Sequence, residues 1–282
     1  MENPMKKLIL AAVALSLFIS GAATAADLAA RPYTKAPVIA PVYSWTGFYI
    51  GGNVGGQWGD SDPRTSTEFV PGGYFQPSSV PAIAALGAQH INSSSVTGGL
   101  TAGYNWQVNN VVLGIEGDIN WFGFKGSAVG SALYPCCAPT GFTIGSSVSA
   151  DWLATIRGRL GFVAAPNWLI YVTGGAAIAD VKADFIFTDN NSAVLETAAL
   201  RDTRVGWTAG VGGEYAVGNG WSFKAEYLYV DLGRATVTST NMTVGGVLPV
   251  PTNPFTHSAN ITSNIVRVGV NYKFGGPLVA RY

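Results

Sequence analysis

Eight charged side chains fall at alternate positions of otherwise apolar segments, and they are the residues of this sequence that could do chemistry. Charged residues are scarce, since Asp, Glu, Lys and Arg together make up only 11% of the 282 residues. Alternate spacing places such residues on one face of an extended strand. Four acids and four bases facing one another could select ions in a pore or pair into a salt-bridged plug. The eight residues are Glu116, Asp118, Arg157, Arg159, Glu214, Lys224, Glu226 and Arg267.

The balance of charge distinguishes these two interpretations. A filter that selects ions usually carries a ring of one sign, whereas these acids and bases sum to zero. Counted from one end of each predicted strand, Glu116, Arg157, Glu226 and Arg267 fall at similar depth, which predicts a layer but assigns no pairs. We therefore favour a structural plug and keep a pore lining as the alternative.

Three side chains in long polar segments could bind iron or haemin, namely His90, Tyr134 and His257. Imidazole and phenolate groups are known haem ligands, but histidines in loops are more often simply solvated. Asp60 and Asp62 lack the further spaced oxygen ligands that a calcium loop requires. The sequence therefore predicts no cofactor and no metal site, and the alternative function is haemin binding or adhesion through the extracellular loops.

Nothing in the sequence forms a convincing catalytic constellation. Hydrolysis by a side-chain nucleophile needs a Ser, a base and an orienting acid within mutual reach, and His257 followed by Ser258 is an isolated match. Cys136 and Cys137 are adjacent, so a disulfide between them would be only a local clip, and no nearby His indicates a metal or a catalytic thiol. We expect a protein that is not an enzyme.

Strict alternation of apolar and polar residues indicates the elements that hold these side chains. Between Val96 and Val108 the even positions are mainly apolar, and the odd positions are Thr, Gly, Asn and Gln. A soluble sandwich would normally carry Lys and Glu on its polar face. An uncharged polar face fits the interior of a barrel whose exterior contacts lipid.

The same alternation recurs in eight segments, an even number as in single-chain bacterial barrels. Short turns of 109–110, 164–167 and 218–220 alternate with four long polar connections. This asymmetry predicts an all-β fold, an eight-stranded antiparallel transmembrane up-and-down β-barrel, with long loops outside the cell and both termini in the periplasm. The predicted strands are 45–58, 95–108, 111–124, 148–162, 168–181, 205–217, 221–232 and 264–274, and the predicted extracellular loops are 59–94, 125–147, 182–204 and 233–263.

The tryptophans divide between the two ends of these strands. Four lie toward the long loops and four toward the short turns or termini, as two interfacial girdles would require. The first group is Trp58, Trp121, Trp152 and Trp207, and the second is Trp45, Trp106, Trp168 and Trp221.

The N-terminal segment is typical of an exported protein. Lys6 and Lys7 precede an apolar run, and a small-residue cleavage site ends at Ala25, so residues 1–25 are predicted to be a signal peptide. An uncleaved membrane anchor is the alternative, which the short apolar run disfavours. Residues 26–44 form a Pro-rich periplasmic lead-in, and residues 45–282 form the barrel. Zero net charge and the lack of a basic cluster exclude nucleic acid as an expected partner.

Both ends of the predicted barrel resemble known patterns. Gly269, Tyr272 and Phe274 in "RVGVNYKF" resemble the C-terminal signal that the barrel-assembly machinery reads, although Gly275 to Tyr282 follow and Tyr282 is an alternative terminal aromatic. The opening "WTGFYIGGNVGGQW", the "PYTKAPVIAPVYSW" lead-in and the "VRVGVNYKFGG" end resemble the outer-membrane immunogenic proteins of rhizobia-like bacteria, a branch of the porin-family small barrels. The resemblance implies an OmpA-like barrel with exposed loops at the cell surface and no catalytic or ligand-binding residues.

We therefore expect a structural, immunogenic surface protein of the bacterial outer membrane, and a weak porin activity toward small solutes is left open. The expected partners are outer-membrane lipid, lipopolysaccharide and the assembly machinery. Host or environmental ligands at the loops are also left open.

Overall fold

The computed structural model describes residues 43–246 and 253–275. The predicted signal peptide, nearly all of the predicted lead-in and Tyr282 lie outside these ranges. Within them the chain is built almost entirely of long antiparallel strands with one short helix. No helix in this part of the chain is long and apolar enough to cross a membrane.

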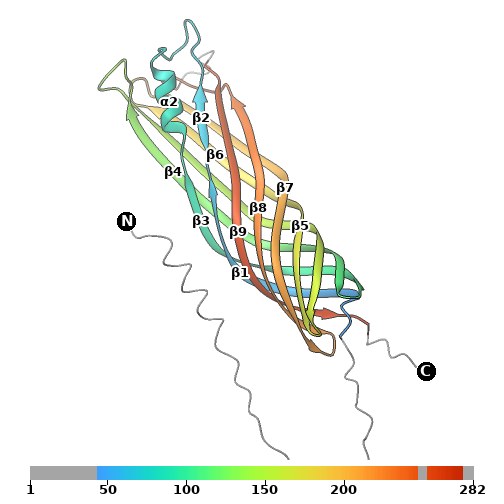
Figure 1. Ribbon diagram of the computed structural model, residues 1–282. Helices are drawn as coiled ribbons and strands as arrows, with labels where there is room; N and C mark the ends of the chain where they lie inside the picture. The colour runs from blue at the N-terminus through green and yellow to red at the C-terminus, as the bar shows by residue number, and fades with distance from the viewer. Residues whose placement is uncertain (1–42, 247–252, 276–282) are drawn as a thin grey trace, which may run out of the picture. The chain divides into compact units, whose positions relative to one another are not determined.

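Eight long strands close into a barrel (Figure 1). Each strand pairs with the next along the chain, and the last strand β9 pairs back onto β1, where Gly55 lies opposite Arg267. A short strand, β2, continues past β1 along the edge of β9. The elements are β1 (Gly47–Ser61), β2 (Arg64–Thr67), α2 (Ser79–Gly87), β3 (Ile91–Val108), β4 (Val111–Leu133), β5 (Gly141–Ala165), β6 (Trp168–Asp189), β7 (Leu195–Gly218), β8 (Trp221–Ser239) and β9 (Phe255–Lys273).

The connections at one end of the barrel, the turn end, are tight. Val108 pairs with Val111 and Gly218 with Trp221, so each of these hairpins turns in two residues. Asn219 and Gly220 both have positive φ, 51° and 83°, as the preferred two-residue hairpin turn requires. The opposite end, the loop end, carries α2 and the longer connections.

The strands extend much further toward the loop end than the sequence predicts. β4 and β5 are joined by only residues 134–140, although 125–147 is predicted to be a loop, and β6 and β7 are joined by 190–194 instead of 182–204. The range 233–263 likewise contains the end of β8 and the start of β9. These segments carry polar residues such as Ser and Thr on their outer face, so they look like loops by composition although they are strands beyond the lipid-facing band.

Three β-bulges lie at a similar level, in β4 between Trp121 and Phe124, in β5 between Ala150 and Leu153, and in β8 after Asp231. A bulge inserts one residue and locally disrupts the ladder. In β5 the inward side chains occupy odd positions below the bulge and even positions above it. Simple alternation therefore assigns the wrong face to the upper part of this strand.

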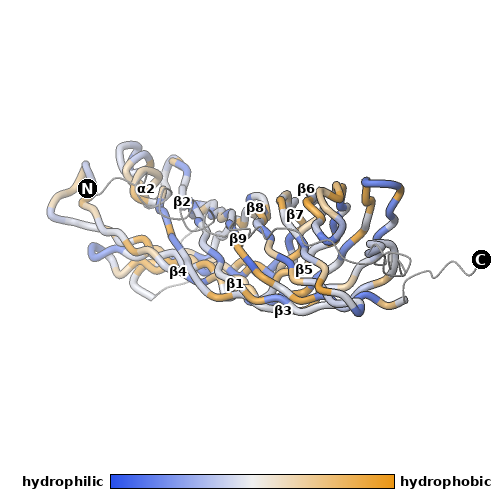
Figure 2. The backbone as a smooth tube through the Cα atoms, turned by 60° about the horizontal axis from the view of Figure 1, so that its bottom comes forward, coloured by the Kyte–Doolittle hydropathy of each residue, from blue (hydrophilic) through white to orange (hydrophobic). Residues whose placement is uncertain are grey.

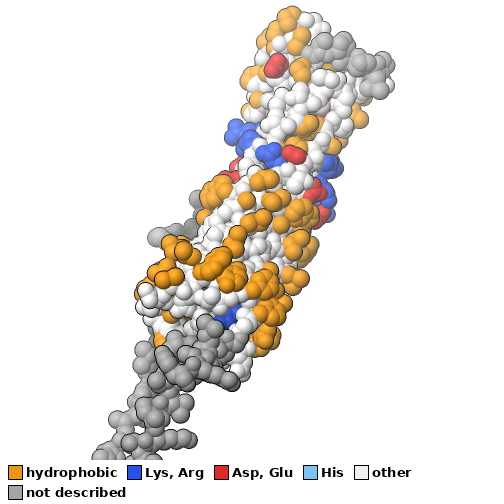
Figure 3. Space-filling view, turned by 90° about the vertical axis from the view of Figure 1, so that its right-hand side faces the viewer, with side chains coloured by type: hydrophobic (Ala, Val, Ile, Leu, Met, Phe, Trp, Pro, Cys, Tyr) orange, Lys and Arg blue, Asp and Glu red, His pale blue; other side chains and the backbone are white. Residues whose placement is uncertain are grey.

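The outer surface is divided into bands. Apolar side chains cover the half nearer the turn end, and a ring of charged residues follows above it (Figure 3). The ring contains exposed ion pairs, including Lys182 with Asp151 at 2.6 Å and Arg201 with Asp184 at 2.5 Å. Along single strands hydropathy alternates between neighbouring residues (Figure 2). The apolar band fits a lipid-embedded wall, and the charged ring fits its boundary.

Six of the eight tryptophans fit the predicted girdles, Trp152 is half-buried at the bulge in β5, and Trp45 does not fit them. Trp58, Trp121 and Trp207 are exposed on the outer wall, as are Trp106, Trp168 and Trp221 near the turn end. Trp45 is only 2% exposed and packs inside the turn end against Leu169 and Tyr171. It precedes β1, so its side chain is free to turn into the mouth of the barrel instead of standing on the lipid face.

Candidate functional site in the barrel lumen

Glu116 on β4 is the centre of a charged network that crosses the lumen. Its Oε1 accepts a hydrogen bond from Nη2 of Arg157 at 2.6 Å, and Nζ of Lys224 lies 3.1 Å from both carboxylate oxygens. Its Oε2 accepts the hydroxyl of Tyr49 at 2.7 Å and lies 3.4 Å from Nη1 of Arg159. Side chains from β1, β5 and β8 therefore meet at one buried carboxylate.

Arg157 on β5 connects three carboxylates, two on the neighbouring strand β4 and one on β8. It lies directly opposite Glu116 in the β4–β5 register, and its Nη2 also donates to Oδ2 of Asp118 at 2.7 Å. Its Nη1 donates to Oε1 of Glu226 on β8 at 3.0 Å, and its Nε donates to the hydroxyl of Thr155 at 2.9 Å. One guanidinium thus spans the lumen and uses its fixed donor geometry on several strands at once.

Arg267 ties the last strand into the same network. Its Nε and Nη2 donate to Oε2 of Glu226, its cross-strand neighbour, at 2.8 and 2.6 Å. Its Nη2 also donates to Oδ2 of Asp118 on β4 at 3.0 Å. β9 is therefore connected to β4 across the lumen as well as to β8 and β1 by backbone pairing.

Arg159 and Glu214 form the part of the network nearest the turn end. Nη2 of Arg159 donates to Oε2 of Glu214 at 2.9 Å, while Ser222 and Asn271 donate to Oε1 at 2.5 and 2.9 Å. The Arg159 guanidinium lies 3.9 Å from the ring centre of Tyr171, close enough for a cation–π interaction. All eight charged residues singled out in the sequence thus lie in one connected network.

Sequence reasoning missed the two tyrosines that complete the network. The Tyr49 hydroxyl donates to Glu116 and accepts from Nη1 of Arg159 at 2.7 Å. The Tyr171 hydroxyl donates to Oε1 of Glu226 at 3.0 Å. Both tyrosines occupy the inward parity of their strands. In β1 the polar Asn53 and Gln57 share that parity, and this signal could have identified Tyr49.

Each of these tyrosine rings lies over a glycine directly opposite on the next strand. Gly103 faces Tyr49 and Gly212 faces Tyr171. A Cβ atom on Gly103 would come within 2.5 Å of the Tyr49 hydroxyl oxygen, and one on Gly212 within 2.4 Å of the Tyr171 ring. The glycines therefore provide the space that lets the hydroxyls reach the carboxylates.

Side chains also fill the lumen above and below the network. Trp45 and Leu169 occupy the turn end. On the other side an apolar cluster includes Phe122 and Phe185, and a second cluster near the loop end contains Phe187 and Ile83 of α2. The polar layer is thus enclosed between apolar layers.

The arrangement neutralises charge inside the lumen. Four acids and four bases are buried together, and burying ions is costly unless they are paired and hydrogen bonded. Within residues 43–246 and 253–275, no three His, Cys, Asp or Glu side chains are grouped so as to hold a metal ion. The arrangement therefore supports ion pairing between the buried acids and the buried bases.

The three candidate haemin ligands lie in different environments. His257 is a buried residue of β9 and contacts Thr65 and Glu196 through its two ring nitrogens, at 2.9 and 3.2 Å. The Tyr134 hydroxyl donates to Asp189 at 3.3 Å inside the loop end. Only His90 is exposed. The expectation that all three lie in loops is wrong for His257, which belongs to β9. Tyr134 does lie in the connection between β4 and β5, but its side chain is buried inside the loop end.

His90 contacts the aspartates that were considered as calcium ligands. Its Nδ1 lies 2.7 Å from Asp62 and its Nε2 lies 3.5 Å from Asp60. The hydrogen bond to Asp62 raises the pKa of the imidazole above its ordinary value. Asp60 ends up in β1, not at the start of a loop. These residues form an exposed hydrogen-bonded group beside the charged ring.

Cys136 and Cys137 form a disulfide in the connection between β4 and β5. Both cysteines are exposed, and the nearby backbone closes through a hydrogen bond from Tyr134 N to Thr140 O at 2.9 Å. The bond is local to this hairpin tip.

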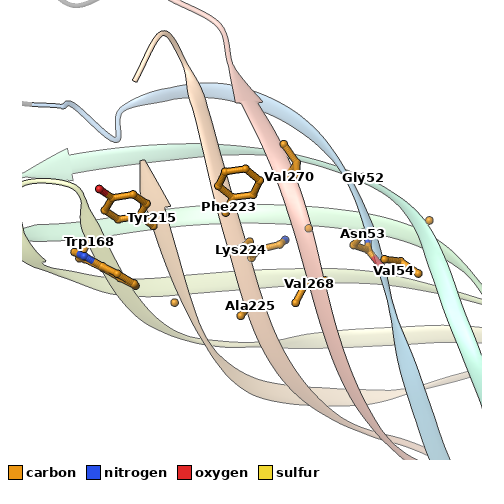
Figure 4. Close-up of a pocket in the computed structure, with 13 residues that line it drawn as sticks. Gly52, Asn53, Val54, Trp168, Tyr215, Phe223, Lys224, Ala225, Val268 and Val270 are labelled. Atoms are coloured by element: carbon orange, nitrogen blue, oxygen red, sulfur yellow. The ribbon is translucent and has the colours of Figure 1, made fainter. Parts of the chain in front are cut away.

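The wall around β9 contains the residues of the predicted assembly signal. Gly269 faces Gly52 and Asn53 of β1, and the Phe274 ring stacks on Phe48 at a centroid distance of 5.7 Å. The outer surface here has a hollow of about 760 Å³, whose lining includes Phe223 and Val268 (Figure 4). The last strand therefore joins the first at a seam that contains close glycine contacts and a stacked aromatic pair.

Comparison with known proteins agrees with this geometry. A family model described as an outer membrane protein β-barrel domain matches residues 11–274. The chain belongs to this family. Members of this family are outer-membrane proteins, so the protein is located in the outer membrane. The closed ring of antiparallel strands is the fold that the family name describes.

Relatives of the family in Brucella and Rhizobium extend the likeness. The chain is 36% identical over 273 residues to the 31 kDa outer-membrane immunogenic protein of Brucella melitensis biotype 1, which covers 96% of this chain and 100% of that protein. It is 29% identical over 197 residues to the 22 kDa outer membrane protein of Rhizobium leguminosarum bv. viciae, covering 70% and 68% of the two chains. The resemblance to outer-membrane immunogenic proteins is thereby confirmed.

Solved barrels show lower similarity. Neisserial surface protein A matches with a TM-score of 0.35 and 15% identity, covering 81% of this chain and 98% of that one. OprG of Pseudomonas aeruginosa has a TM-score of 0.42, and the outer membrane protease OmpT of Escherichia coli has 0.44, each covering 81% of this chain and 97% of the other, at 11% and 8% identity. Likenesses at this level carry no argument about function.

Proposed function

We propose that this protein is a closed structural barrel of the outer membrane that displays its loop end outside the cell. The buried network is its internal plug and not an ion filter. The observation that carries the proposal is the contact of Arg157 with acids on both β4 and β8, which puts a guanidinium across the lumen. An eight-stranded barrel is only just wide enough for its own side chains, so such a cross-link leaves little room for a solute.

Several further features support a plug. Opposite charges are equal in number, all eight charged residues are buried, and apolar layers lie on both sides of them. The network also favours one strand register, because a slip of one residue would turn the charged side chains of a strand to the opposite face. A weak porin activity toward small solutes would require a continuous path past these layers.

Conductance of the refolded full chain in planar lipid bilayers tests this function. The expected result for the natural sequence is a bilayer that stays at its background conductance after the protein is inserted. Folding of the inserted protein is checked on SDS gels, where the unheated, folded barrel runs at a different apparent size from the heated, unfolded chain. Steady single-channel steps from the natural sequence would overturn the plug and support the porin alternative.

We also propose the partners of each band of the outer surface. Outer-membrane lipid surrounds the apolar band, and lipopolysaccharide headgroups lie beside the charged ring, where Lys182 and Arg201 are exposed. The assembly machinery recognises β9 through Gly269, Tyr272 and Phe274. Cross-linking from position 182 in intact cells should capture lipopolysaccharide, and the same probe at position 129 is the control above the ring.

The geometry gives less support to the alternative of haemin binding. His257 and Tyr134 are buried and bonded to protein groups, and His90 stands apart from them on the surface. Titration of the refolded protein with haemin, followed by absorbance, should show no saturable spectral change. We also propose that the protein is not an enzyme. The candidate base His257 is buried between Phe185 and Phe255, where a substrate would not reach it.

A further inference from the structure

The disulfide between Cys136 and Cys137 joins two residues that are already adjacent in the chain. In the chain-entropy account, the stabilisation from a disulfide grows with the length of the loop that it closes, and no residue lies between these two cysteines. The bond also links no further strand, because both cysteines belong to the connection of β4 to β5. Its contribution to the stability of the barrel is therefore small.

Backbone hydrogen bonds close the same hairpin tip independently of the sulfurs. The ladder between β4 and β5 runs up to the pair of Leu133 with Gly141. Beyond this pair, Tyr134 N donates to Thr140 O at 2.9 Å and Cys137 N donates to Tyr134 O at 3.2 Å. Thr140 N in turn donates to Cys137 O at 2.9 Å. The disulfide is thus not needed to hold the two strands together at this end.

Both cysteines are exposed, and the hairpin that carries them stands at the loop end of the barrel (Figure 1). A disulfide breaks when a thiolate attacks one of its sulfurs, so access decides whether an external thiol can react. Exposed disulfides are the labile ones, whereas structural disulfides of secreted proteins resist reduction. This disulfide is accessible to thiols and has little structural role.

Cys136 differs from Cys137 because its sulfur lies beside the N-terminus of α2. The sulfur is 3.6 Å from the hydroxyl oxygen of Ser79, a buried residue that begins the helix. Among the described residues, the side chain of the capping residue Ser78 makes no hydrogen bond to this end of α2, and the first turn holds no acid. A helix N-terminus favours negative charge and stabilises thiolates. Cys136 is therefore the sulfur better able to leave as a thiolate.

We propose that Cys136 and Cys137 form a site of thiol–disulfide exchange with small thiols. The thiolate of a small thiol attacks the sulfur of Cys137 and forms a mixed disulfide with it. The bond between the two cysteines breaks, and its electron pair stays on Cys136 as a thiolate that accepts a hydrogen bond from the Ser79 hydroxyl. This setting is not visible in the sequence, where Ser79 lies 57 residues from Cys136.

A second small thiol completes the exchange. Its thiolate attacks the sulfur of the first small thiol, so that one small disulfide is released and Cys137 leaves as a thiolate. Over both steps two small thiols are oxidised to one disulfide, and the two cysteines are reduced and take up the two protons. The exchange is stoichiometric, and the pair begins oxidised because exported proteins meet an oxidising environment.

Reduction of the folded protein tests the site on the refolded full chain in detergent micelles. The protein is incubated with an excess of reduced glutathione, quenched with acid and labelled with a maleimide polymer that shifts its SDS-gel band once for each free thiol. We expect two labels, and an unlabelled aliquot should still run as the folded barrel when it is not heated. A pair that stays oxidised, or that is reduced only in the unfolded chain, would overturn the proposal.

The mixed disulfide shows which sulfur is attacked. After a short incubation and an acid quench, free thiols are blocked with iodoacetamide, and the hairpin peptide is sequenced by tandem mass spectrometry. We expect glutathione on Cys137 and the blocking group on Cys136. The reverse placement would contradict the assignment of Cys136 as the leaving thiolate.

Ser79→Ala and Ser78→Ala are a matched pair of variants for the contact with α2. Ser79→Ala removes the hydroxyl beside Cys136 and should slow formation of the mixed disulfide by at least about threefold, the effect of losing one hydrogen bond. Ser78→Ala changes the adjacent exposed residue, removes no cap bond, and should change the rate by less than about twofold. Equal rates in the two variants would show that Ser79 does not assist the exchange.

These readouts do not depend on which end of the barrel faces outward or on whether the lumen conducts. Failure of the exchange site is therefore distinguishable from failure of the proposed closed barrel, which the bilayer measurement tests.

Discussion

Arg157 and Glu116 lie directly opposite each other on β5 and β4, and Nη2 of the arginine is 2.6 Å from Oε1 of the glutamate. Neither side chain is exposed. The pair is not isolated, because the same arginine nitrogen also contacts Asp118 and the same carboxylate contacts Lys224. Removing either partner would leave buried charges on several strands without compensation.

Replacing Arg157 and Arg267 together by Ser should destabilise the barrel and open it to cations. Breaking a buried pair by removing one partner costs about 3–5 kcal/mol. The acids left behind, chiefly Asp118 and Glu226, would then attract cations into the vacated space. We expect a lower free energy of unfolding in denaturant titrations and a new cation-selective conductance in planar bilayers.

Arg204→Ser is the matched control for this double variant. Arg204 pairs with Asp202 at 3.2 Å in the exposed ring, and such surface pairs contribute only about 0–1 kcal/mol. Stability and conductance should therefore stay close to those of the natural sequence. If the natural sequence already conducts and the double variant changes only ion preference, the charged residues line an open pore.

Gly269→Ala should impair closure of the barrel. A Cβ at this position would lie 2.8 Å from the Gly52 carbonyl oxygen and 3.2 Å from Cβ of Asn53, at the seam between the last and first strands. We expect a smaller folded fraction on unheated SDS gels after refolding. Gly56→Ala is the control, since nothing lies within 4 Å of a Cβ there. Equal folding of the two variants would contradict a steric role for Gly269.

Protease added to intact cells should cut the connections beyond the strand ends. Residues 68–78 and 240–246 lie between elements and include exposed positions such as Glu68 and Phe69. The turns at Asn109–Asn110 and Asn219–Gly220 should be spared, because they would face the periplasm. Residues 195–204 should also resist, since they are part of β7. Cleavage confined to the short turns would mean that the orientation is inverted.

The pKa of His90 should be measurably raised by its contact with Asp62. The hydrogen bond to Asp62 is the main cause, so the folded protein favours the protonated imidazole. The stabilisation is fully present below the pKa of the unfolded chain and is lost as pH rises through the raised pKa of the folded state. NMR titration of the His90 ring should show this shift, and Asp62→Asn should lower the pKa. An unchanged His90 pKa in that variant would contradict the assignment.

The sequence determined the architecture because strand alternation is a local property. Each residue of a strand points to one of two faces, so the polar parity identified which charged residues lie inside without knowledge of their neighbours. The positions of the short turns were also predictable from the sequence, since Asn219 and Gly220 suit a backbone with positive φ. The family resemblance rested on the same local patterns at the two ends of the chain.

Only the tertiary structure decided which residues meet. The contacts of Arg157 with Glu226 and of Arg267 with Asp118 cross the lumen, and they depend on barrel closure and strand stagger, which no single segment encodes. Bulges reversed the inward parity in part of β5. The upper parts of the strands were predicted to be loops because their outer faces are polar. Trp45 turned inward because it precedes the ladder. The separation of β4 from β3 beyond Trp121 is likewise a relation between distant residues, which local patterns cannot predict.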